Sequence, residues 1–169
     1  MKWMLLLLVL FLVQSCEPGK PQAMSSASLY AIDGDTLSID VRLRGVDAPE
    51  LDQMCLDNAK CVPCGRYARA FLRELIFNKA AQIEIDRSTS YGRLVGTVSS
   101  DNQDIAQTLI EAGWAIPIDE FLKEDPVRQA RYFNAYANAE HSKRGMHGMK
   151  FDTPYQGRSK KGVICQPNH

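Results

Sequence analysis

The chain has no net charge, no long hydrophobic segment and no internal repeat, and each absence excludes a class of protein. Its 169 residues include 20 basic and 20 acidic side chains, so no overall positive field marks it as a nucleic-acid-binding protein. The apolar run of residues 5–13, even with Trp3 and Met4 before it, is too short to span a membrane as a helix. Without repeats or low-complexity blocks, the chain is long enough for one domain with its own core.

The charge is balanced overall but uneven along the chain. Residues 24–120 carry 9 basic and 15 acidic side chains, a net of −6, whereas residues 121–169 carry 9 and 4, a net of +5. An acidic site with a basic flank would suit an anionic polymer whose reacting phosphate is offset by a metal ion. A solvated, Lys-rich tail explains the charge pattern equally well.

The N-terminus is typical of an export signal. Lys2 precedes the apolar run, and the Val-Gln-Ser-Cys that follows it resembles a bacterial lipobox, with Cys16 as the lipidated residue. Gln14 is untypical of that motif, so an ordinary cleaved secretion signal is the alternative. We therefore expect an exported protein: either a lipoprotein anchored to a membrane of the bacterial cell envelope, or a secreted or periplasmic protein.

Cysteine usage agrees with export. If Cys16 is lipidated, an even number of cysteines remains, which favours disulfides. The remaining cysteines are Cys55, Cys61, Cys64 and Cys165. Cys-Val-Pro-Cys at residues 61–64 also suggests zinc or a redox motif, but no His or second Cys-x-x-Cys lies at ligand spacing. Four cysteines allow three pairings and the sequence does not choose; we favour Cys55–Cys64 with Cys61–Cys165.

Hydrophobic periodicity predicts five short strands and three helices. The strands are expected at residues 28–32, 36–39, 41–44, 81–86 and 91–99, and the helices at 65–78, 105–112 and 126–142. This order fits an α+β fold, a small five-stranded barrel of the oligonucleotide-binding kind with three α-helices packed against it. The expected organisation is a signal peptide (1–15), a flexible tether (16–27), the domain (28–148) and a basic C-terminal tail (149–169).

The candidate site residues concentrate in residues 32–50. This segment reads I-D-G-D-T-L-S-I-D-V-R-L-R-G-V-D-A-P-E, with five carboxylates and two arginines around two short apolar runs. Acids at both ends of short strands, where the chain must turn, suggest a site for a hard cation with a phosphate beside it. Asp33 is better explained as a turn former than as a ligand, and Asp40 and Arg44 as surface hairpin residues.

These motifs resemble the staphylococcal nuclease (thermonuclease) family. The matching pieces are I-D-G-D-T at 32–36, R-L-R-G-V-D-A-P-E at 42–50, C-G-x-x-A at 64–68 and Y-G-R at 91–93. The resemblance covers roughly residues 28–148. It implies a staphylococcal-nuclease-like barrel and a calcium-dependent phosphodiesterase, expected to be a monomer. Such an enzyme cleaves DNA and RNA at the P–O5′ bond and leaves 3′-phosphate ends.

The resemblance implies a calcium site built from residues of two motifs. Asp35 and Asp47 would bind Ca²⁺ through their carboxylates, and Ala48 through its backbone carbonyl. Oxygen ligands of this kind suit calcium. Only seven positions separate Asp35 from Arg42, fewer than is usual in the family, so the hairpin that carries the site is shortened.

The resemblance also implies catalytic and substrate-binding roles. Arg42 and Arg93 would clamp the phosphate with their planar forks, Glu50 would activate or orient the attacking water, and Tyr91 would lie beside the bound nucleotide. A non-catalytic barrel that binds an oligonucleotide or a protein is the alternative. We favour the enzyme because both aspartates, both arginines and Glu50 are present. A redox protein would not explain the cluster of acids and arginines.

Overall fold

The computed structural model describes residues 29–90, 93–159 and 164–165. The expected signal peptide (1–15), tether (16–27), lipidation site Cys16 and nucleotide-side residue Tyr91 lie outside the described residues. Within the described part, no helix has the length and apolar character needed to cross a membrane.

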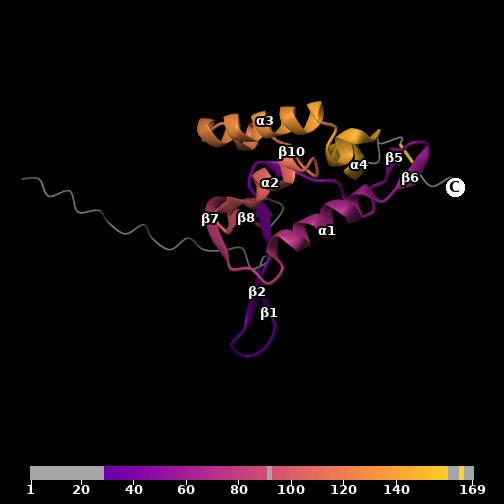
Figure 1. The fold of residues 1–169 in the computed structure, drawn as a ribbon. Coiled ribbons are helices and arrows are strands. Elements are labelled where there is room, and N and C mark those ends of the chain that lie inside the picture. Colours follow the sequence, from indigo (N-terminus) through magenta and orange to yellow (C-terminus); the bar gives the residue numbers. More distant parts are fainter. Residues whose placement is uncertain (1–28, 91–92, 160–163, 166–169) are drawn as a thin grey trace, which may run out of the picture.

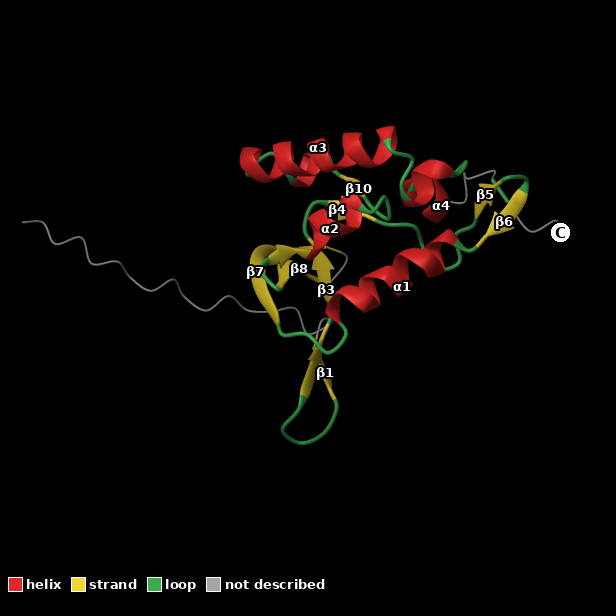
Figure 2. Cartoon of the chain, viewed as in Figure 1, coloured by secondary structure: helices red, strands yellow, loops and turns green. Residues whose placement is uncertain are grey.

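Strands and helices are both well represented, so the predicted α+β class is confirmed (Figures 1 and 2). The strands are β1 (Leu29–Ala31), β2 (Leu37–Ile39), β3 (Val41–Leu43), β4 (Val46–Asp47), β5 (Cys55–Asp57), β6 (Lys60–Val62), β7 (Ala81–Ser90), β8 (Arg93–Ser100), β9 (Gln103–Asp104) and β10 (Ile116–Pro117). The helices are α1 (Cys64–Ile76), α2 (Ile105–Glu111), α3 (Pro126–His141), α4 (Pro154–Arg158) and the 3₁₀ turns η2 (Asp119–Phe121) and η3 (Gly145–Gly148). Strands β1, β2, β3, β7 and β8 lie where the sequence predicted strands, whereas β4, β5, β6, β9 and β10 were not predicted, because two or three residues show little periodicity.

Strand β8 is the centre of the main sheet. It pairs in parallel with β3, antiparallel with β7, and antiparallel with β9 near its end. The other described strands form separate two-stranded ladders, β1–β2, β4–β10 and β5–β6. The described strands therefore form no closed barrel, which differs from the five-stranded barrel expected from the sequence.

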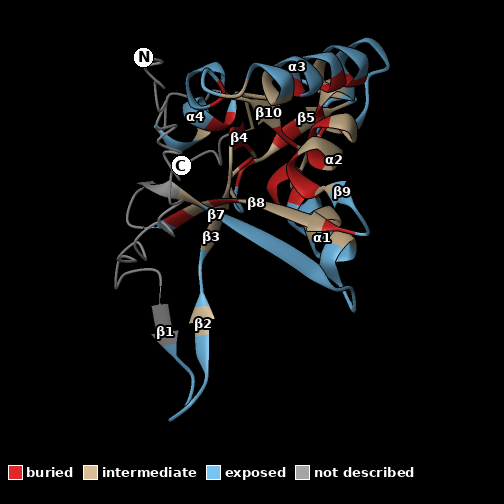
Figure 3. Ribbon diagram, turned by 90° about the vertical axis from the view of Figure 1, so that its left-hand side faces the viewer, coloured by how far each residue is buried: buried red, intermediate tan, exposed pale blue. Residues whose placement is uncertain are grey.

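The β1–β2 hairpin protrudes from the body of the protein (Figures 1 and 3), and its loop and β2 are largely exposed. Only Asp40 separates β2 from β3, so the chain has no room to turn back between them. It runs on instead from the β1 ladder into the β8 ladder. At about 3.3 Å per residue, the run from Leu37 to Leu43 is about 20 Å long. This short link is the physical reason why the hairpin points away and the barrel stays open.

Helices α1 and α2 form where the sequence predicted them. On α1, Ala68 is buried and Phe71, Leu72 and Leu75 pack against the core, while Ile76 is exposed. Helix α2 packs against β8, α1 and α3. Its first turn is capped by Asp104, whose carboxylate accepts hydrogen bonds from two backbone amides.

Helix α3 begins at the residue that the sequence predicted, Pro126. The Asp125 side chain accepts a hydrogen bond from the backbone N–H of Arg128, and a proline takes the first helical position. Tyr132, Ala135 and Ala139 are buried, whereas Phe133 is exposed.

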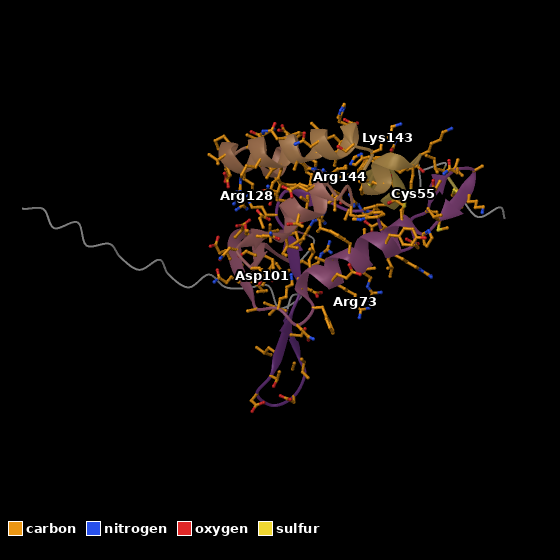
Figure 4. The ribbon with its side chains drawn as sticks, viewed as in Figure 1. Cys55, Arg73, Asp101, Arg128, Lys143 and Arg144 are labelled. Carbon is orange, nitrogen blue, oxygen red and sulfur yellow. A yellow bond between two sulfur atoms is a disulfide. The ribbon has the colours of Figure 1, made fainter. Side chains whose placement is uncertain are left out.

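The segment after Gly148 is part of the fold, although the sequence predicted only a basic tail there. Lys150 exchanges two backbone hydrogen bonds with Leu56 of β5. Two disulfides hold this end of the molecule, Cys55–Cys64 and Cys61–Cys165, which is the pairing favoured from the sequence (Figure 4, Cys55). The C-terminal segment is thus tied to the β5–β6 ladder and to the start of α1.

Candidate functional site

Asp47 is a buried carboxylate surrounded by arginines. It lies on β4, opposite Ile116 of β10, and only 6% of the residue is exposed. Its Oδ1 and Oδ2 accept hydrogen bonds from Nη1 and Nη2 of Arg158 at 2.6 and 2.7 Å. Nη2 of Arg42 lies 3.5 Å from Oδ1. A carboxylate buried to this degree requires positive partners, and two guanidinium groups supply them.

Glu50 lies next to Asp47 and shares one of its partners. Its Oε1 accepts a hydrogen bond of 3.0 Å from Nη1 of Arg158, and its side chain is 41% exposed. The Glu50 backbone is bonded at both its N–H and C=O to Gln53. A Cβ at Gly65 would collide with the Glu50 carbonyl oxygen, so α1 begins directly against this residue. The scaffold thus fixes Glu50 while leaving its carboxylate open to water.

The two arginines expected to bind phosphate lie on the same face of the main sheet. Arg42 on β3 is opposite Val95 on β8, and Arg93 precedes Val95 by two residues, so its side chain leaves the same face. Arg93 is exposed and makes no ion pair with another residue of the described part. The β3–β8 register therefore brings together two guanidinium groups that are far apart in sequence.

A pocket of about 680 Å³ opens beside Arg42. Its walls include Arg42, Arg44, Val95 and Ser90 from the sheet and Phe121 from η2, whose surface is 51% exposed. This volume is in the range of small-molecule sites. It lies on the sheet face that carries the two arginines, so it is the described hollow best placed to receive part of a nucleotide.

Asp35 lies apart from the other candidate residues. It is exposed in the loop of the β1–β2 hairpin, at the opposite end of the molecule from β4 and α3 (Figure 2). Its backbone N–H donates to Asp33 Oδ1 at 3.2 Å, and its Oδ1 accepts from Thr36 Oγ1 at 3.2 Å. Asp33 thus forms the expected turn, and hydrogen bonds from Thr36 and Asp35 lower the pKa of the Asp33 carboxyl.

The arrangement does not fit a calcium ion. Calcium takes about six to eight oxygen ligands. Among the described residues, no three acidic, His or Cys side chains gather closely enough to hold a metal ion. Both oxygens of Asp47 are engaged by Arg158, and Asp35 lies on the remote hairpin. Ala48 directly follows Asp47, but its carbonyl alone cannot complete the site.

Arg158 is the site residue that the sequence analysis missed. It ends α4, whose first turn has a capping box in which the side chains of Thr153 and Gln156 bond each other's backbone N–H. The hydrogen bonds to Asp47, and then to Glu50, raise the pKa of Arg158 above its ordinary value. The Thr-Pro-x-Gln pattern of residues 153–156 predicts such a helix start, but no local pattern indicates contact with a residue 111 positions earlier.

Comparisons with known proteins identify one family. The family model described as "Staphylococcal nuclease homologue" matches residues 40–147, which include Arg42, Asp47, Ala48, Glu50 and Arg93 but neither Asp35 nor Arg158.

Three curated proteins are similar over part of their length. Succinoglycan biosynthesis protein ExoI of Rhizobium meliloti (strain 1021) is 37% identical over 94 residues, 52% of this chain and 49% of that protein. Endonuclease YncB of Bacillus subtilis (strain 168) is 34% identical over 115 residues, 59% and 53% of the two chains. The SPbeta prophage-derived endonuclease YokF of the same organism is 27% identical over 139 residues, 70% and 46%. The chain spans about half the length of these relatives.

Proposed function

The chain belongs to the family of staphylococcal nuclease homologues, and on that premise we propose that it hydrolyses the phosphodiester bonds of nucleic acid. Two of its relatives are named endonucleases, which supports this activity. The observation that carries the proposal is the cluster of Arg42, Asp47 and Glu50 beside a pocket, with Arg93 on the same sheet face as Arg42. All four residues lie within the range that the family matches.

The residues of the cluster suit the chemistry of this reaction. A phosphodiester is anionic and its leaving alkoxide is poor, so hydrolysis requires charge neutralisation and a positioned water. Arg42 and Arg93 would each hold phosphate oxygens in a planar fork as negative charge grows, an effect of about 3 kcal/mol for each such donor. Glu50, fixed through its backbone but exposed at its carboxylate, would accept a hydrogen bond from the attacking water.

The finer features of the activity rest on the family resemblance. We propose that both DNA and RNA are substrates, that the P–O5′ bond is cleaved to leave 3′-phosphate ends, and that calcium is required. A calcium site would need Asp35 to move toward Asp47 and Arg158 to withdraw, because neither condition is met in this arrangement. A barrel that binds nucleic acid or protein without cleaving it is the alternative.

We also propose that the protein is exported and works as a monomer. The two disulfides support export, because such bonds persist in oxidising compartments outside the cytosol. Lipidation of Cys16 would then anchor it to a membrane of the cell envelope. Replacement of Cys16 by serine should release the protein from membranes; continued association would exclude an anchor at this residue.

A cleavage assay tests the proposed activity. Purified protein with both disulfides intact would be incubated with denatured DNA and with RNA, in calcium and then in a chelator. We expect both substrates to be degraded in calcium and spared in the chelator. A folded protein that binds these substrates without cleaving them would support the binding barrel instead. Cleavage that survives the chelator would retain the nuclease and remove the calcium requirement.

A further inference from the structure

A second group of arginines lies on helix α1, outside the site described above. Arg66, Arg69 and Arg73 are all exposed and follow one another at spacings of three and four residues. Residues with this spacing lie on one face of a helix. Figure 4 shows Arg73 on the side of α1 that is turned away from α3. Among the residues that the structure describes, no acidic side chain forms an ion pair with any of these three arginines.

The three arginines line an open groove along α1, here named the α1 groove. A hollow of about 660 Å³ is lined by Leu51, Asp52, Arg66, Arg69, Ala70 and Arg73. A smaller hollow of about 430 Å³ continues from it, because both are lined by Ala70 and Arg73. The second hollow ends at Phe77, whose surface is 69% exposed. Two carboxylates, Asp52 and Glu74, also line the groove, which leaves its lining with a net positive charge.

The α1 groove starts directly beside the candidate catalytic cluster. The two residues that follow Glu50 in the chain form one end of the groove. Gly65, in the first turn of α1, lies so close to the Glu50 carbonyl oxygen that a Cβ would collide with it. At 1.5 Å per residue, the path from Arg66 to Phe77 is about 16 Å long. A nucleic-acid strand whose reacting phosphate lies beside Glu50 would therefore have its next nucleotides within reach of the groove.

We propose that the α1 groove binds single-stranded nucleic acid next to the phosphate that is cleaved. Its arginines hold backbone phosphates, since a guanidinium donates to phosphate oxygens in a planar fork. Phe77 provides an aromatic surface on which a base stacks. A positive groove with an aromatic platform holds single strands with little preference for sequence, because every base has a face that can stack. The inference rests on the proposed function for the class of substrate, but it concerns binding and not cleavage.

An anionic membrane surface is the other large partner that a row of arginines could contact. The position of the groove favours nucleic acid, because one end of the groove is formed by the residues that follow Glu50. Nucleic acid is also a linear polyanion, which suits a narrow row of charges along a single helix.

Fluorescence anisotropy of a labelled oligonucleotide tests the groove. The oxidised full-length protein would be titrated, in a chelator, into 5′-labelled single-stranded DNA of 20 nucleotides, and a gel would confirm that the DNA stays intact. The groove variant replaces all three arginines, as Arg66→Gln, Arg69→Gln and Arg73→Gln. Loss of three phosphate contacts should reduce the slope of log affinity against log salt by about 2 and weaken binding about a hundredfold at 0.1 M salt.

The matched control removes the same charge from another part of the surface. It combines Arg131→Gln, Lys143→Gln and Arg144→Gln, three exposed residues on α3 or just after it (Figure 4). The affinity of this control for the oligonucleotide should stay within about threefold of that of the unaltered protein. An equal loss in the control and the groove variant would mean that only net charge matters, and would overturn the proposal.

Phe77→Ala gives an independent test that keeps every charge. Loss of one stacked base should weaken oligonucleotide binding about tenfold and leave the salt slope unchanged. Near-ultraviolet circular dichroism would confirm that each variant is folded, and if the groove variant is not, Phe77→Ala decides alone. Unchanged affinity in the groove variant and in Phe77→Ala, or no binding by the unaltered protein, would overturn the proposal.

Two further outcomes separate the groove from its alternatives. If the groove variant loses binding to phosphatidylglycerol vesicles but keeps its affinity for the oligonucleotide, the groove contacts a membrane and the proposal is wrong. A protein that binds the oligonucleotide through the groove and cleaves nothing would remove the nuclease and leave the groove. An active nuclease whose affinity for DNA does not depend on the three arginines would do the reverse.

Discussion

The acidic cluster around Asp47 and the loop of the β1–β2 hairpin both contain carboxylates that were expected to bind calcium, but their surroundings differ. Asp47 is 6% exposed and is paired with two arginines, whereas Asp35 is exposed and, among the residues that the structure describes, bonds to neighbours in its own loop. The difference arises from what each segment packs against. The cluster lies between β10, the start of α1 and α4, and the hairpin extends beyond the sheet (Figure 3). Two residues that a family motif assigns to one site therefore act together only where the fold brings them close.

The largest expected effect is on turnover, at the Glu50 end of the cluster. Glu50→Gln should lower turnover on denatured DNA about a thousandfold, because a neutral amide cannot accept the proton of the attacking water. Glu74→Gln, on the exposed face of α1, should leave turnover unchanged. Initial rates measured at saturating substrate would check both, and near-normal turnover in Glu50→Gln would remove this residue from the mechanism.

The contrast between the buried Asp47 and the exposed Asp35 should appear in the free energy of unfolding. Asp47→Asn should lower the free energy of unfolding by about 3 kcal/mol, because it leaves the guanidinium groups of Arg42 and Arg158 without their buried counter-ion. Asp35→Asn should change it by less than about 0.5 kcal/mol, as expected for an exposed loop. Urea denaturation of the two variants measures both values. Equal losses would mean that the hairpin is packed against the site after all.

Arg93 extends the cluster along the sheet, so its replacement should lower turnover and leave the stability of the fold unchanged. Arg93→Ala should lower turnover about a hundredfold through lost stabilisation of the phosphate charge. The matched control, Arg131→Ala, removes an arginine from α3 that is not part of the pocket beside Arg42. If Arg93→Ala and Arg131→Ala cleave at the same rate, Arg93 does not take part in catalysis beside Arg42.

The smallest expected effect is a pH dependence of stability from His147. Burial lowers the pKa of His147, whose ring lies between Tyr136 and Phe151, so the folded state favours the neutral ring. Its stabilisation is complete above the unfolded pKa of about 6.5 and is lost as the pH falls through the lower folded value. Melting temperatures from pH 7.5 to 5 should fall less steeply in His147→Phe than in the unaltered protein. The exposed His141, replaced by Gln, serves as the control, and parallel slopes in all three proteins would contradict this assignment.

Sequence alone predicted the local part of the site. Arg42, Asp47 and Glu50 lie within nine residues of each other, and Gly45, in a left-handed conformation at φ +71°, turns the chain between them. In so short a segment the backbone can adopt few conformations, so the relative positions of these side chains are largely set by local sequence. The family resemblance rests on the same short segments, which is why the class of fold could be predicted from them.

Contacts that depend on long-range packing could not be predicted in this way. Arg93 reaches the face of Arg42 only through the β3–β8 register, and Arg158 reaches Asp47 across 111 residues through a helix that no periodicity announced. The motif led us to expect Asp35 beside Asp47, but its placement depends on the length of the link between β2 and β3. That link is one residue, Asp40, which leaves the chain no room to turn back.

One measurement bears most directly on the central claim that this cluster hydrolyses nucleic acid. A 5′-labelled single-stranded oligonucleotide would be incubated in calcium with the unaltered protein and with Glu50→Gln, and the ends of the products identified by mass. The account predicts fragments ending in 3′-phosphate from the unaltered protein and an intact oligonucleotide with Glu50→Gln. An oligonucleotide left intact by both proteins, or cut equally by both, would contradict it.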